Sequence, residues 1–169
     1  EVGSRFSDIA VSVNISPLEF KASDIVTRVQ AAVQATGFDA SRLELEVTEN
    51  ATLCKPENTL SLMHELKALG VRLLMADFCA GYASVDYLRS FPFDGIKLDK
   101  SFIFAMEGSE TAKNIVEKII GLGKDFNLAV TAEGVETKEQ LQQLQSFHCD
   151  VAQGYFFSRP VTLDKILLN

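Results

Sequence analysis

The sequence predicts an α/β fold built around a mainly parallel sheet. Short apolar runs rich in β-branched residues alternate with longer amphipathic runs, which is the pattern of successive βα units. The composition, 47% hydrophobic and 23% charged with four prolines, is that of a globular chain with a sizeable core. No low-complexity segment or linker interrupts the series, so we expect residues 1–169 to form one domain.

Six strands are expected, each a short apolar run of the kind that is buried in a parallel sheet. In chain order they are IAVSVNI (9–15), RLELEVT (42–48), VRLLMAD (71–77), DGIKLD (94–99), LAVTAE (128–133) and DVAQGYF (150–156). Helical spacing of apolar residues predicts helices at 23–35, 57–69, 83–90, 110–126 and 138–145. Gly70 stands where the second helix should end, and Thr137 with Gln140 three residues later forms a capping-box pattern.

Charge and composition argue against several function classes. A net charge of −7 disfavours binding to long nucleic acid, because such binding depends on basic side chains that replace phosphate counterions. No apolar run approaches the roughly 20 residues of a membrane helix, and the N-terminus lacks the pattern of a signal peptide, which predicts a cytoplasmic protein. The three cysteines, Cys54, Cys79 and Cys149, show no CxxC spacing, so we expect reduced thiols rather than disulfides or a zinc site.

Polar residues fall at the last positions of all six predicted strands. They are Asn14, Glu46, Asp77, Lys97 with Asp99, Glu133 and Gln153. Because the carboxyl ends of parallel strands share one edge, these side chains are expected to converge on one cavity. Any one of them alone is equally well explained as a helix cap or a solvated side chain, and Lys97 as a lysine that extends to solvent.

Six segments resemble, in this order and at this spacing, the EAL domain family. They are VNIS (13–16), ELEVTE (44–49), ADFCAGYAS (76–84), IKLDKSFI (96–103), AEGVE (132–136) and QGYFFSRP (153–160). The resemblance covers nearly the whole chain. It implies a β/α barrel related to the TIM barrel and hydrolysis of cyclic di-GMP to linear pGpG with two magnesium or manganese ions. Family members often follow a GGDEF or sensor domain, which makes such domains expected partners.

The resemblance also implies a role for each site residue. Two hard cations that hold a phosphodiester need oxygen ligands from several strands, and the positions matching the family's metal ligands are Asn14, Glu46 and Asp77. Lys97 matches a lysine that orients the attacking water. The further roles are catalytic for Asp99 and Glu133, ligand-binding for Gln153, Asp77 and Phe156, and positioning of the loop after the third strand for Glu49 and Glu136.

The sequence departs from the family pattern in two places. Active members usually read DDFGTGYSS where this chain reads ADFCAGYAS, so Ala76 replaces the first aspartate of a pair, and Cys79 and Ala80 replace a glycine and a threonine. The motif that names the family, with its metal-binding glutamate, has no counterpart before VNIS. Six βα units extrapolate to about 225–250 residues for eight, so we expect a barrel that is incomplete in this chain and lacks its N-terminal portion.

These departures lead to one preferred function and two alternatives. The preferred one is a degenerate EAL domain that acts as a cyclic di-GMP receptor or a protein-interaction module, with the family's metals not bound. The first alternative is an active phosphodiesterase in which Glu49, Asp99 or groups from outside the chain supply the missing ligands. The second is a structural or dimerisation domain without a nucleotide, since an open barrel edge favours a homodimer.

Overall fold

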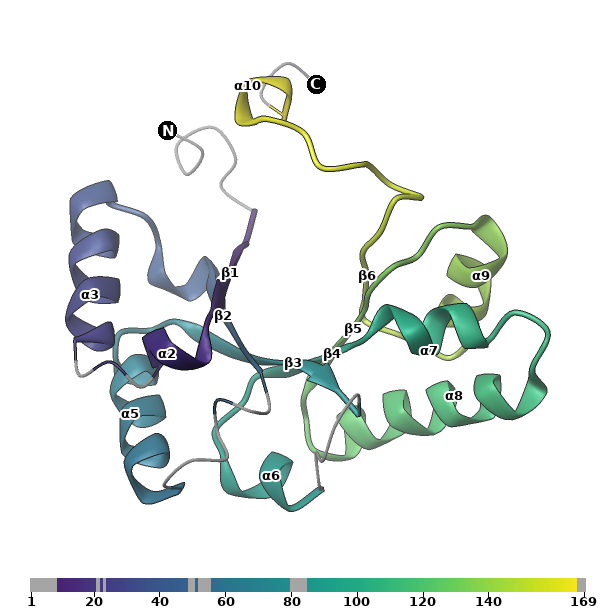
Figure 1. Cartoon of the computed structure of the whole chain (residues 1–169), viewed down its shortest axis with the longest axis horizontal. Helices are drawn as coiled ribbons and strands as arrows, with labels where there is room; N and C mark the ends of the chain where they lie inside the picture. The colour runs from purple at the N-terminus through teal and green to yellow at the C-terminus, as the bar shows by residue number, and fades with distance from the viewer. Residues whose placement is uncertain are drawn as a thin grey trace. The chain divides into compact units, whose positions relative to one another are not determined.

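The computed structural model describes residues 9–20, 22, 24–48, 51, 56–79 and 85–166. The chain divides into two compact units, Glu1–Ile96 and Lys97–Asn169, and strand β4 (Gly95–Leu98) contains the division between them. Each unit is described by itself (Figure 1). The expectation that residues 1–169 form one domain stays a prediction.

The first unit contains a parallel sheet in the order β1-β2-β3. Its elements are β1 (Val11–Ile15), α2 (Pro17–Phe20), α3 (Ile25–Thr36), the 3-10 helix η1 (Ala40–Arg42), β2 (Leu43–Thr48), α5 (Pro56–Ala68), β3 (Arg72–Phe78) and α6 (Val85–Ser90). The register pairs Asn14 with Glu46, Glu46 with Leu74, and Thr48 with Ala76. The sheet therefore places the predicted site positions of β1 and β2 side by side.

Alternation along the strands gives the sheet one fully apolar face, whereas the opposite face is polar on β2 and carries the buried Leu74 and Ala76 on β3. The apolar face is formed by four side chains that are at most 2% exposed: Leu45, Val47, Leu73 and Met75. The alternate residues of β2, Glu44, Glu46 and Thr48, point to the opposite face. Figure 1 shows α3 and α5 on one side of the sheet.

The second unit continues the alternation of helices and strands. Its elements are α7 (Lys100–Ala105), α8 (Glu110–Asp125), β5 (Ala129–Ala132), α9 (Lys138–Ser146), β6 (Val151–Ala152) and α10 (Leu163–Ile166). β5 pairs with β6 in parallel, with Thr131 opposite Val151. The core between α8 and the strands is fully buried at Val116, Ile120 and Val130.

All six predicted strands are present, and the predicted capping box of Thr137 and Gln140 is confirmed at the start of α9. The extended run predicted at 150–156 is wrong beyond Ala152. After Gln153 the chain forms a turn in which the Phe157 N–H donates to the Gly154 carbonyl at 3.1 Å, and the Phe156 N–H donates to the Val135 carbonyl at 2.9 Å. Helices α2, α7 and α10 are short elements that the sequence periodicity did not predict. Within the described residues, no helix has the length and apolar character needed to span a membrane.

Candidate functional site

A cavity of about 340 Å³ lies in the second unit at the carboxyl ends of its strands. It is lined by Lys100, Phe104, Glu133, Gly134, Glu136, Gln153, Gly154 and Tyr155. Three of the predicted site residues, Glu133, Glu136 and Gln153, are therefore brought together on one cavity. Asp99 and Phe156 do not line it.

Lys97 and Glu133 form a close ion pair at the end of β4 and β5. The Lys97 Nζ lies 2.5 Å from the Glu133 Oε1, and the two side chains are 5% and 28% exposed. The alternative in which Lys97 extends into solvent is wrong. A lysine buried to this extent requires a nearby negative charge, because desolvation otherwise disfavours the ammonium. The ion pair therefore fixes the position of the Glu133 carboxylate, which lines the cavity.

Asp99 serves as the N-cap of α7. Its Oδ1 accepts a hydrogen bond from the Ser101 N–H at 2.9 Å. Hydrogen bonds from Ser101, through its side chain and then its backbone, hold the pKa of the Asp99 carboxyl below its ordinary value. One oxygen of this carboxylate is thus engaged in starting a helix, as the helix-cap alternative predicted.

Two glycines let the backbone of the Glu133–Thr137 segment approach its neighbours. A Cβ added at Gly134, where φ is +72°, would lie 2.4 Å from the Lys100 Cβ, and one added at Gly154 would lie 2.2 Å from the Val135 carbonyl oxygen. The Val135 N–H also donates to the Gln153 carbonyl at 3.0 Å. Neither glycine is among the site residues predicted from the sequence, although they lie inside the motifs AEGVE and QGYFFSRP.

In the first unit, Asn14 and Glu46 are register partners on the polar face of the sheet. Asn14 is exposed, whereas Glu46 is only 5% exposed. Two residues earlier on each strand lies a polar network: the Ser12 Oγ donates to Glu44 Oε2 at 2.8 Å, and Arg72 Nη1 lies 2.7 Å from Glu44 Oε1. This network was not predicted from the sequence; its Arg72 compensates the charge of Glu44, which lies two residues before Glu46 on β2.

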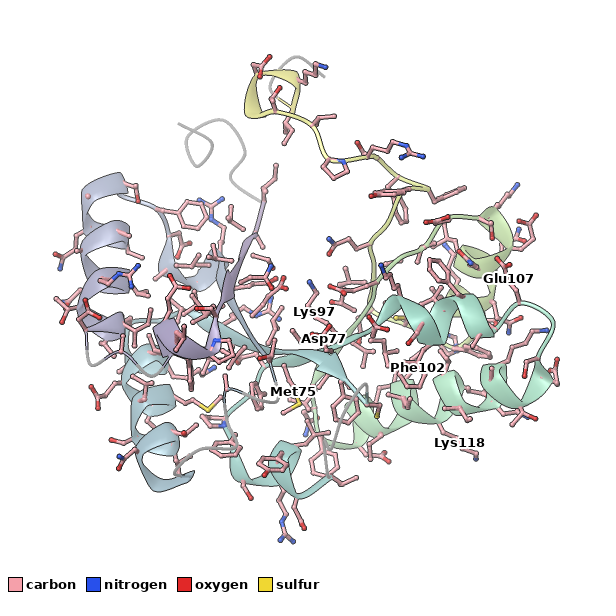
Figure 2. The ribbon with its side chains drawn as sticks, viewed as in Figure 1. Met75, Asp77, Lys97, Phe102, Glu107 and Lys118 are labelled. Atoms are coloured by element: carbon pink, nitrogen blue, oxygen red, sulfur yellow. The ribbon has the colours of Figure 1, made fainter. Side chains whose placement is uncertain are left out.

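Ala76, which replaces the first aspartate of the family's pair, lies near the end of β3. Ala76 is 6% exposed and pairs with Thr48, so its methyl group lies on the same face as Glu46, which precedes Thr48 by two residues. Asp77 is exposed, with φ of +55°, and Cys79 has φ of +66°. Asp77 is labelled on β3 in Figure 2. Left-handed backbone at a non-glycine residue costs about 1–2 kcal/mol, so this strand end is strained at two nearby positions.

The residues described here do not fit a two-metal centre. Across the described ranges, no group of three or more His, Cys, Asp or Glu side chains is placed to hold a metal ion. Asn14 and Glu46 offer an amide oxygen and a carboxylate, but the methyl group of Ala76 offers no donor. Glu49 and Cys54 lie outside the described residues.

A family model for the EAL domain matches residues 2–160. The chain belongs to the EAL domain family. It is 41% identical over 155 residues to the cyclic di-GMP phosphodiesterase NbdA of Pseudomonas aeruginosa, a match that covers 92% of this chain and 20% of NbdA. The chain spans about a fifth of the length of the curated relatives it matches first.

Solved EAL structures share the fold. The phosphodiesterase PaMucR in complex with c-di-GMP superposes with a TM-score of 0.91 at 32% identity, over 98% of this chain and 67% of that one. The manganese and cyclic di-GMP complex of Klebsiella pneumoniae BlrP1 matches with a TM-score of 0.84 at 28% identity, over 94% of this chain and 41% of that one. The predicted α/β class, a TIM-like β/α barrel of the EAL type, is confirmed. The EAL domain of this chain is thus related to cyclic di-GMP phosphodiesterases.

Proposed function

We propose that this EAL domain is degenerate: it binds cyclic di-GMP and hydrolyses it slowly or not at all. The observation that carries this proposal is the buried methyl group of Ala76 on the face of Glu46, at the position where active members have the first aspartate of a pair. A methyl group cannot bridge two cations, and the loss of metal-held charge stabilisation raises the barrier of phosphodiester cleavage by several kcal/mol.

The cavity of the second unit supports retention of binding. Its volume of about 340 Å³ falls within the range of small-molecule sites. Lys100 supplies a cation suited to a phosphodiester, and Phe104 and Tyr155 are 41% and 52% exposed. The Arg159 guanidinium lies 4.7 Å from the centroid of the Tyr155 ring, so Phe104 and the other face of Tyr155 offer surface for stacking against a base. Gln153 adds an amide that can donate and accept hydrogen bonds. A sensor or GGDEF domain in the whole protein, and a homodimer, are the partners that we propose on the same family grounds.

One observation favours the active-enzyme alternative. The Lys97–Glu133 ion pair is intact, although it would serve no catalytic purpose in a pure receptor. That alternative needs substitute metal ligands, and Asp99 is a poor one because its Oδ1 already accepts the Ser101 N–H at the helix start.

Calorimetric titration of cyclic di-GMP, first in EDTA and then in magnesium, tests the proposal. A receptor binds the nucleotide with similar affinity in both buffers, and chromatography shows no pGpG. Robust magnesium-dependent formation of pGpG would overturn the proposal in favour of the enzyme. Absence of binding in both buffers would overturn it in favour of a structural or dimerisation domain.

A further inference from the structure

We propose that Gln140, on α9 and outside the cavity, is a positioning residue that fixes the Glu133–Thr137 segment and thereby sets the nucleotide affinity of the cavity. The affinity part rests on the proposed function, whereas the hold on the segment does not. The motif pattern identified Gln140 only as half of a capping box. The structure gives it two further contacts.

The Gln140 side chain is 4% exposed, and both of its terminal atoms are engaged. Its Oε1 accepts hydrogen bonds from the Glu136 N–H at 2.7 Å and from the Thr137 N–H at 3.1 Å. Its Nε2 donates to the Glu107 Oε1 at 2.8 Å. A capping box requires only the contact to the N-cap backbone. The bonds to Glu136 and Glu107 therefore connect α9 to two segments that the box does not involve.

The segment that Gln140 holds forms one wall of the cavity. The Glu133 N–H donates to the Leu98 carbonyl at 3.1 Å and the Val135 N–H donates to the Gln153 carbonyl at 3.0 Å, which fixes the first half of the segment to the ends of β4 and β6. The second half, which carries the exposed carboxylate of Glu136, is fixed through Gln140. Loss of this acceptor would free the wall at Glu136 while leaving it attached at Val135.

The hydrogen bond to Glu107 joins the Gln140 side chain to the end of α7, the helix that begins at Lys100. Glu107 follows the end of α7, and α7 begins at Lys100, which lines the cavity. Figure 2 shows Glu107 at the far end of α7 beside α9. Gln140 thus links the wall that contains Glu133 and Glu136 to the helix that carries Lys100. Glu107 and Gln140 also border a separate cavity of about 370 Å³.

A role-exchange series tests this inference. In Gln140→Glu the new carboxylate faces the Glu107 carboxylate without a donor between them, so the repulsion between the two moves it away from the Glu136 and Thr137 N–H groups. Glu107→Gln alone keeps an acceptor for the Gln140 Nε2. The double variant Gln140→Glu/Glu107→Gln restores the bond with donor and acceptor exchanged.

Two measurements report on the series at pH 7: hydrogen exchange of the assigned Glu136 and Thr137 amides, and cyclic di-GMP affinity by calorimetry. In Gln140→Glu we expect the Glu136 and Thr137 amides to exchange at least tenfold faster, while the exchange rate of the Val135 amide stays unchanged. The same variant should bind cyclic di-GMP at least tenfold more weakly. Glu107→Gln and the double variant should lie within about threefold of the parent protein.

The outcomes separate this inference from the proposed function. If the parent protein does not bind cyclic di-GMP, the proposed function fails, and the amide exchange rates alone decide whether Gln140 holds the segment. If Gln140→Glu loses thermal stability but keeps parental affinity and exchange, Gln140 is only a helix cap and the inference is overturned. Should Gln140→Glu fail to fold, Glu107→Ala at an exposed position removes the Nε2 acceptor alone, and unchanged exchange in that variant would also overturn the inference.

Discussion

Ala76 determines what the first unit can bind. A carboxylate placed at this 6% exposed position would lie near the buried Glu46. Without a cation, the two negative charges would destabilise the fold, since an uncompensated buried polar group costs about 1–3 kcal/mol. We therefore expect Ala76→Asp to lower the free energy of unfolding in EDTA by about 1–3 kcal/mol, measured by urea denaturation. In this chain manganese should restore little of it.

The same substitution should behave differently in a longer chain that includes the family's N-terminal glutamate. There a second carboxylate completes the donor set, so manganese should bind and raise the melting temperature of Ala76→Asp. Ala76→Asn is the matched control because it adds an amide of the same shape without charge. Tight binding of two metals by the longer chain with Ala76 unchanged would show that other residues supply the ligand.

Cys79 replaces a glycine of the family pattern. Its φ of +66° lies in the left-handed region, where a non-glycine residue costs about 1–2 kcal/mol. Glycine removes that cost but adds about 0.5–1 kcal/mol of backbone entropy to the unfolded chain. We expect Cys79→Gly to raise the free energy of unfolding by about 0.5–1 kcal/mol, measured by chemical denaturation. Cys79→Ala controls for loss of the thiol, and an equal gain in that variant would contradict the backbone explanation.

At the scale of elements, the turn after β6 depends on one glycine. A Cβ at Gly154 would lie 2.2–2.7 Å from three backbone atoms of Val135, and backbone atoms of a paired segment cannot move aside cheaply. We expect Gly154→Ala to lower the free energy of unfolding by at least about 2 kcal/mol. Gly121→Ala is the matched control, because Gly121 lies inside α8 with open space around its Cβ position. That control should gain about 0.5–1 kcal/mol through helix propensity.

The start of α7 should be sensitive to acid. The Ser101 hydrogen bonds lower the pKa of Asp99 in the folded state, so the stability that the carboxylate contributes is present above the unfolded pKa of about 3.9 and is lost as the pH falls through the folded pKa. Asp99→Asn keeps an acceptor but does not titrate, so its stability should fall less than that of the parent between pH 5 and pH 3. Asp99→Ala should lose about 1 kcal/mol at pH 7. Identical acid profiles for the parent and Asp99→Asn, followed by urea midpoints, would contradict this account.

The sequence predicted elements well where a local pattern determined them. Apolar periodicity located all six strands, and Thr137 with Gln140 located the start of α9. It failed after Ala152, because the chain direction there depends on the Phe156 N–H meeting a carbonyl of Val135, a contact between distant parts of the sequence. For the same reason the pattern could not distinguish the two possible roles of Asp99, which depend on the three-dimensional position of its carboxylate.

At the scale of the whole molecule, the strand-end rule and the family motifs predicted the candidate site only in part. They selected Glu133, Glu136 and Gln153, which line the cavity. They missed Lys100 and Tyr155, although these residues lie inside the motifs IKLDKSFI and QGYFFSRP. Which residues share a cavity depends on how turns fold over strand ends, and local periodicity does not contain that information.

The expected single domain leads to a last prediction about cooperativity. β4 contributes Gly95 and Ile96 to the first compact unit and Lys97 and Leu98 to the second, so loss of order in either unit should disturb this strand. If residues 1–169 form one domain, a lesion in the second unit destabilises both units equally. We therefore expect Gly154→Ala to reduce the protection of the Leu73 and Met75 amides as much as that of the Val130 and Ala132 amides, measured by native-state hydrogen exchange near the melting transition. Gly121→Ala should not lower the protection of either pair of amides. If Leu73 and Met75 keep parental protection while Val130 and Ala132 lose theirs, the two compact units unfold independently, and the chain behaves as two domains.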